Sequence, residues 1–187
     1  MDGFMRRRAL MSVSATDPKL IYEAHNIILT GSNFVDTGFK PYSSENHDRD
    51  FMITIRYSQI EPVSEKTAII CGAKYEGTLS GVGYPGFYYR FLGSSAQWKT
   101  HIQLALSGSN AYSFTKPATT YENVNFYIRR VGGVFSVQMD GDTEHVLNVA
   151  TVPVFDNSVL IGAGVQTNGN HFRYTKGTID YFRIEYL

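Results

Sequence analysis

The sequence is short of cysteine, of net charge and of long apolar runs, and each shortage excludes a class of protein. Its single cysteine, Cys71, cannot form an internal disulfide, and its place in the apolar run AIICGAK predicts a buried thiol. No apolar run approaches the roughly 20 residues that a membrane-spanning helix needs. Seventeen basic and seventeen acidic side chains give a formal net charge of +0. We therefore do not expect a domain-wide field suited to nucleic acid or an anionic membrane.

Metal-binding patterns are equally scarce. The spacing typical of a zinc site is missing among the five histidines, which are His25, His47, His101, His145 and His171. The acidic run from Asp140 to Glu144 resembles the start of a calcium loop, but a loop of the EF-hand kind needs glycine at its sixth position, where this chain has His145. Turn preferences predict that these carboxylates point into solvent.

A second oxygen-rich stretch follows Pro41 and comprises Glu45, Asn46, Asp48 and Asp50. Lys40 and Arg49 can neutralise this stretch without a metal ion. We therefore expect no cofactor, with calcium at this stretch as the alternative.

Aromatic residues and glycines are abundant instead, and both favour a β protein. Tyr, Phe and Trp make up 14% of the chain, and 17 glycines supply turns. In DFMITIRYSQI, Phe51, Ile53, Ile55 and Tyr57 share one face, the period of two that is typical of a half-buried strand. Similar segments are YEAHNIIL, TAIICGAK, GFYYRFLG, THIQLALS, VNFYIRR, VFSVQMD, HVLNV, SVLIGAG and TIDYFRIEY. The sequence therefore predicts an all-β fold, an antiparallel two-sheet β-sandwich or jelly roll.

Two local features refine this prediction. Gly132 and Gly133 can adopt positive φ without steric cost, so they predict a tight hairpin. The alternation changes phase between Ile179 and Phe182, which predicts a β-bulge near Asp180 and Tyr181.

The first eighteen residues differ from the rest of the chain, and we divide it into an N-terminal arm, 1–18, and a lectin-like domain, 19–187. The arm contains MRRRALM, whose apolar part is too short for a signal peptide. Three cations alone also give little affinity for nucleic acid. A docking arm uses both parts, because apolar side chains anchor it and arginines pair with partner carboxylates. The residues expected to dock are Phe4, Met5, Arg6, Arg7, Arg8, Leu10 and Met11.

Several short motifs occur in the order typical of one superfamily. Asp140-Gly141 ends a hairpin, Ile161-Gly162-Ala163 follows, and GTIDYFRI, residues 177–184, lies near the end. Together with NFVDTGF and the polar loop KPYSSENHDRD, they make residues 20–187 resemble the concanavalin A-like lectin/glucanase superfamily in its laminin G-like form. The basic start placed before a domain with the element FVDTG also resembles small structural proteins of tailed bacteriophages.

The resemblance implies binding without catalysis. Laminarinase-type members of the superfamily carry an E-x-D-x-x-E strand whose paired carboxylates perform retaining chemistry, and this sequence has no such segment. Sugar rings stack on aromatic faces, while polar loops fix their hydroxyls. We expect glycan contacts from Tyr84, Tyr88, Trp98, Asn168, Asn170 and His171.

We therefore predict a non-enzymatic virion protein of a tailed bacteriophage, in its tail, fibres or head decoration, that adheres to host-surface glycan. Its partners would be other virion proteins, further copies of itself with a trimer favoured, and a cell-surface glycan, without nucleic acid or membrane insertion. It would be assembled in the host cytoplasm and located in the virion. Two alternatives stay open: a bacterial surface or secreted carbohydrate-binding module, and an architectural decoration protein without a sugar ligand.

Overall fold

In the computed structural model, most of the described residues form β-strands. The described residues are 19–62, 67–74, 78–79, 82–83, 86–92, 99–105, 111–117, 123–147, 152–165 and 170–187. Within these ranges there is no helix, and therefore no helix that could cross a membrane. The predicted arm and the predicted contacts Tyr84, Trp98 and Asn168 lie outside the described residues.

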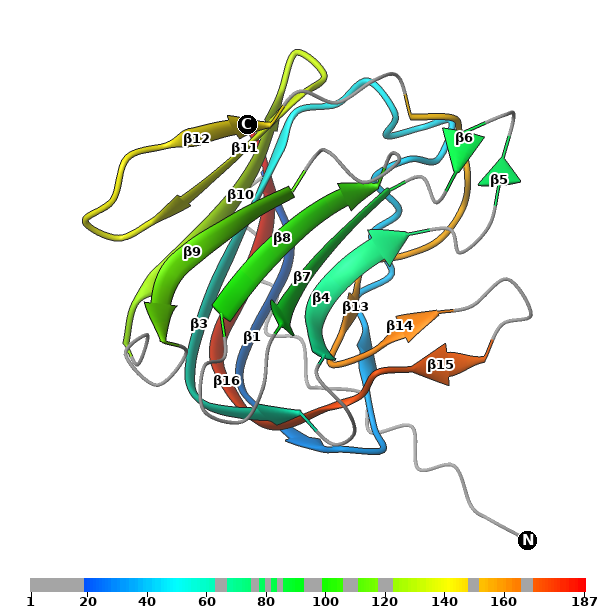
Figure 1. Cartoon of the computed structure of the whole chain (residues 1–187). Helices are drawn as coiled ribbons and strands as arrows, with labels where there is room; N and C mark the ends of the chain where they lie inside the picture. Colours follow the sequence, from blue (N-terminus) through cyan, green and yellow to red (C-terminus); the bar gives the residue numbers. More distant parts are fainter. Residues whose placement is uncertain are drawn as a thin grey trace, which may run out of the picture.

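The first sheet has six strands in the order β1-β16-β3-β10-β11-β12, and all neighbours are antiparallel. Its strands are β1 (Leu20–Thr30), β16 (Thr175–Tyr186), β3 (Phe51–Pro62), β10 (Asn125–Val131), β11 (Val134–Met139) and β12 (His145–Leu147). The last strand of the chain lies between β1 and β3, so the end of the domain pairs with its beginning, as Figure 1 shows.

The second sheet also has six strands, in the order β2-β13-β4-β7-β8-β9. They are β2 (Val35–Asp36), β13 (Leu160–Ile161), β4 (Thr67–Lys74), β7 (Gly86–Leu92), β8 (Lys99–Ala105) and β9 (Ala111–Pro117). Two small hairpins complete the described strands: β14 (Gly164–Val165) with β15 (His171–Phe172), and β5 (Thr78–Leu79) with β6 (Val82–Gly83). In Figure 1 the second sheet lies across the first, so the predicted two-sheet antiparallel sandwich is confirmed.

The core fills the space between the two sheets. The period of two predicted for β3 is confirmed, because Phe51, Ile53 and Ile55 are fully buried on its inner face. Tyr89 of the second sheet meets Phe126 of the first with ring centroids 5.3 Å apart. Cys71 is fully buried as predicted, and this burial raises the pKa of its thiol. The thiol is thus part of the apolar core.

The predicted turn and bulge are confirmed, and several strands differ from prediction. Gly132 and Gly133 have φ of 56° and 79°, and the register of β16 against β3 shifts between Ile179 and Tyr181. The segment SVLIGAG is not one strand but is divided between β13 and the start of β14, because Gly162, at φ 89°, turns the chain directly after Ile161. The strand β9 and the short strands β2, β5, β6 and β15 are absent from the sequence prediction.

The acidic turn after β11 differs in one respect from the prediction. The carboxylates of Asp140 and Glu144 are exposed, but they accept hydrogen bonds from side chains of the first sheet instead of pointing freely into solvent. Asp140 accepts hydrogen bonds from the backbone amide of Asn125 at 3.0 Å, from the Tyr127 hydroxyl at 2.9 Å and from the Asn125 side chain at 2.8 Å. Partial burial opposes ionisation of Asp140, yet these bonds outweigh it and lower the pKa of that carboxyl. Hydrogen bonds from Ser136 and then Arg129 lower the pKa of Glu144 in the same way.

Candidate functional site

The segment that follows β2 leaves the second sheet and forms part of the rim of the sandwich. Gly38 turns the chain with φ of 73°. On either side of it, the Thr37 hydroxyl donates to the Val159 carbonyl at 2.8 Å, and the Val159 amide donates to the Phe39 carbonyl at 2.8 Å. These two hydrogen bonds fix the segment to the chain just before β13.

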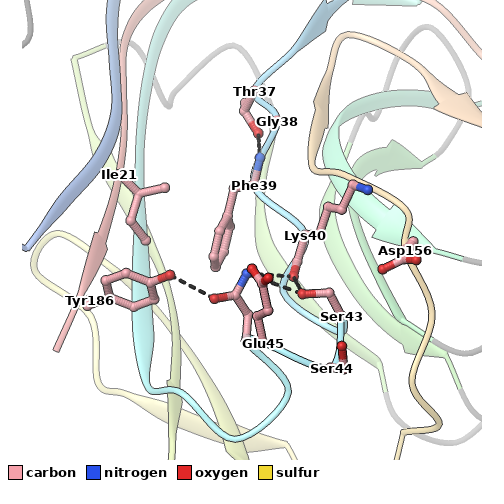
Figure 2. Close-up of a pocket in the computed structure, with 11 residues that line it drawn as sticks. Ile21, Thr37, Gly38, Phe39, Lys40, Ser43, Ser44, Glu45, Asp156 and Tyr186 are labelled. Carbon is pink, nitrogen blue, oxygen red and sulfur yellow. Dashed lines mark hydrogen bonds between the residues drawn. The ribbon is translucent and has the colours of Figure 1, made fainter.

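The loop after Phe39 is held by its own hydrogen bonds. The Lys40 carbonyl accepts from the Ser43 hydroxyl at 3.0 Å and from the Asn46 side-chain amide at 3.1 Å. The Tyr186 hydroxyl donates to Asn46 Oδ1 at 2.8 Å, which ties the loop to the end of β16 (Figure 2). The loop therefore keeps its shape without a ligand.

A pocket of about 560 Å³ opens between this loop and the first sheet. We call it the rim pocket; its lining residues are Ile21, Thr37, Gly38, Phe39, Lys40, Ser43, Ser44, Glu45, Asn46, Asp156 and Tyr186. Figure 2 shows Ile21 and Tyr186 on one side, Lys40 and Asp156 on the other, and Phe39 between them. The volume lies within the range of about 300 to 1,000 Å³ that is typical of small-molecule sites.

Four polar side chains of the rim pocket are available to a ligand. Lys40, Ser44, Glu45 and Asp156 are exposed, and among the described residues their side chains form no hydrogen bond or ion pair. They offer an ammonium group, a hydroxyl and two carboxylates. The half-buried ring of Tyr186 adds an apolar surface. Such a mixture suits a ligand with several hydroxyl groups.

A second surface forms where the β14–β15 hairpin packs on the outer face of the second sheet. Gly164 permits this approach, since a Cβ there would lie 2.6 Å from the Ile69 Cδ1 atom and 2.9 Å from the Tyr88 hydroxyl. The Phe172 ring meets the Tyr88 ring edge-on with centroids 6.3 Å apart. His171 is stacked on Phe34 at 3.8 Å.

The structure thus brings the predicted glycan contact Tyr88 close to the hairpin that contains His171, but it assigns Tyr88 a different role. Tyr88 is only 1% exposed and carries the Lys74 ammonium 5.0 Å above its ring, so it supports the hairpin and does not offer a free face to a sugar. Asn170 is exposed and His171 is half-buried. These two remain accessible to a ligand.

Prediction from the sequence missed the rim pocket. The sequence suggests calcium as the one ligand of its polar loop, and residues from three other parts of the chain complete the lining. Among the described residues, no group of three or more His, Cys, Asp and Glu side chains could hold a metal ion. Asn46 and Asp50 already bind Tyr186 and the Gly132 amide. Calcium binding therefore gains no support here and stays an untested alternative.

No protein-family model and no curated protein sequence match the chain, but solved structures do. The CBM40 domain of the Ruminococcus gnavus IT-sialidase, bound to α2,6-sialyllactose, has a TM-score of 0.60 at 14% identity, over 88% of this chain and 92% of that chain. The leech intramolecular trans-sialidase has a TM-score of 0.57 at 12% identity, and the match spans 90% of this chain but 26% of the enzyme. The chain has a jelly-roll fold of two antiparallel sheets. At these identities the likeness shows the fold alone, so function must be argued from the chain's own residues.

Proposed function

We propose that this domain is a non-enzymatic glycan-binding module that holds a sugar in the rim pocket. The observation that carries the proposal is a preformed pocket with both donor and acceptor side chains left available, on Lys40, Ser44, Glu45 and Asp156. Sugar hydroxyls act as donors and acceptors at once, so such a set can bind them without rearranging the loop.

The solved structures support a binding role. The Ruminococcus gnavus CBM40 domain, which is similar in fold, holds a sialyllactose. Catalysis is less well supported by the pocket. Glu45 and Asp156 are both exposed, whereas the general acid of a glycosidase needs an apolar surrounding to keep its proton.

A glycan array followed by calorimetry tests the proposal. Lys40→Ala should weaken binding of any sugar that the array identifies by about tenfold or more, since hydrogen bonds to charged groups contribute about 1.5 to 3 kcal/mol. Asp48→Asn is the matched control, because the Asp48 side chain is 97% exposed on the same loop and does not line the pocket. Unchanged affinity in Lys40→Ala, with the fold intact, would place the sugar elsewhere.

We further propose, from the sequence, that residues 1–18 attach this module to a tailed-phage virion, with other virion proteins and further copies of the chain as partners. The support is the basic, apolar composition of MRRRALM. If the array finds no ligand, the result favours an architectural decoration protein without a sugar ligand. If the module is instead secreted by a bacterium, residues 1–18 have no virion to attach to.

A further inference from the structure

We infer that the rim pocket selects a sugar without a carboxylate group and prefers one that carries a protonated amino group. This inference rests on the proposed function and names the ligand class of the same pocket. Its basis is the charge of the lining side chains, which is negative in sum, whereas an acidic sugar requires a positively charged site.

Two carboxylates and one ammonium group line the pocket, from Glu45, Asp156 and Lys40. In Figure 2, Lys40 and Asp156 stand on the same side of the pocket, so a ligand there meets one positive and one negative group. Glu45 lies between this side and Tyr186. Its carboxylate supplies the excess negative charge.

The charged groups around the pocket do not reverse this balance. Arg49 has its guanidinium 4.8 Å above the ring of Tyr186, so this cation borders the pocket without lining it, and Asp48 lies 3.0 Å from His47, also outside the lining. Asp36 and Asp50, at the two ends of the segment, accept hydrogen bonds from the amides of Gly38 and Gly132. Within this segment, the carboxylate of Glu45 lines the pocket, whereas those of Asp36, Asp48 and Asp50 lie outside the lining.

Recognition of a sugar carboxylate is usually the task of arginine, whose planar guanidinium binds both oxygens. Among the described lining residues there is no arginine, and the single lysine lies on the side that holds Asp156. A carboxylated sugar in the rim pocket would meet excess negative charge from the lining, and the guanidinium of Arg49, which borders the pocket, is already stacked on the Tyr186 ring. A protonated amino sugar would meet the Glu45 carboxylate, which forms no ion pair within the described structure. The charges thus discriminate between these ligands by both attraction and repulsion.

The test compares three probes of similar size by calorimetry with the full chain: a glucosamine tetramer, its N-acetylated counterpart and sialyllactose. The buffer is at about pH 6, where the amine is protonated, and contains EDTA so that no divalent cation neutralises the carboxylates. We expect the glucosamine tetramer to bind about tenfold more tightly than the acetylated one, and sialyllactose to bind most weakly. Raising the salt concentration from about 0.05 M to about 0.5 M should reduce the preference for the glucosamine tetramer over the acetylated one, because salt screens the attraction between the amine and the carboxylate.

Glu45→Gln should remove the preference for the free amine while preserving binding of the acetylated tetramer. Asp48→Asn should retain both the preference for the free amine and the binding of the acetylated tetramer. Tighter binding of sialyllactose than of the acetylated tetramer, abolished by Lys40→Ala, would overturn the inference. Equal binding of both tetramers to the wild-type chain would also overturn it. Failure of every sugar to bind would instead refute the proposed function itself.

Discussion

The protonation of His171 depends on how its side chain is packed in the folded protein. Its ring is stacked on Phe34 with 22° between the planes. Burial disfavours the charged imidazolium and lowers the pKa of His171, while the Asp36 carboxylate acts in the opposite direction. Folding therefore favours the neutral ring, and this links the packing of the β14–β15 hairpin to pH.

The sign of this link gives a prediction for stability. Because the folded-state pKa of His171 lies below its ordinary value of 6.5, the stabilisation is complete above about that pH and is lost as the pH falls through the folded-state pKa. We expect thermal unfolding to occur at lower temperature at about pH 5.5 than at about pH 7.5, and His171→Gln to reduce this difference. His25→Gln, at an exposed position of the first sheet, is the control. An unchanged difference in His171→Gln would contradict the assignment.

Strand β16 joins the two ends of the domain. It pairs with β1 along one edge and with β3 along the other, and its inward side chains Phe182 and Ile184 are fully buried. The bulge before Tyr181 lets Ile179 and Phe182 both point inward, and the Ser58 hydroxyl donates to Asp180 at 2.9 Å beside it. Packing of this strand therefore contributes to both the sheet and the core.

Truncation of one inward side chain tests the importance of β16. Ile184→Ala should lower the free energy of unfolding by about 2 to 5 kcal/mol, since a fully buried side chain leaves a cavity that the sheets cannot close. Ile28→Ala, on neighbouring β1 with 69% of the residue exposed, should change it by less than about 0.5 kcal/mol. Urea unfolding followed by fluorescence measures both. Similar losses in the two variants would contradict the burial of Ile184.

The sandwich as a whole acts as a frame for segments with little regular structure. The chain from Thr37 to Asp50 contains no strand, yet it is tied to Val159, to Tyr186 and to Gly132, three separate parts of the domain. The pocket is thus supported by both sheets. Such a frame can present a binding site independently of what holds the domain in place.

Deletion of residues 1–18 tests this separation of binding from attachment. The shortened chain should unfold at a temperature close to that of the full chain and keep its affinity for the sugar, because the described strands and the lining of the rim pocket belong to residues 19–187. It should no longer be incorporated into particles, as measured by blotting of purified virions. Undiminished incorporation would refute the docking role of Phe4 to Met11.

The all-β class, the buried face of β3, the hairpin at Gly132 and the bulge near Asp180 could be predicted from the sequence, because each depends on side chains that are neighbours along the chain. The rim pocket could not, since Ile21, Asp156 and Tyr186 meet the polar loop only after the two sheets have formed. The same reason governs Tyr88, an aromatic residue in a promising stretch that the β14–β15 hairpin covers. Local alternation determined which residues form strands, and long-range packing decided which polar groups remain open to a ligand.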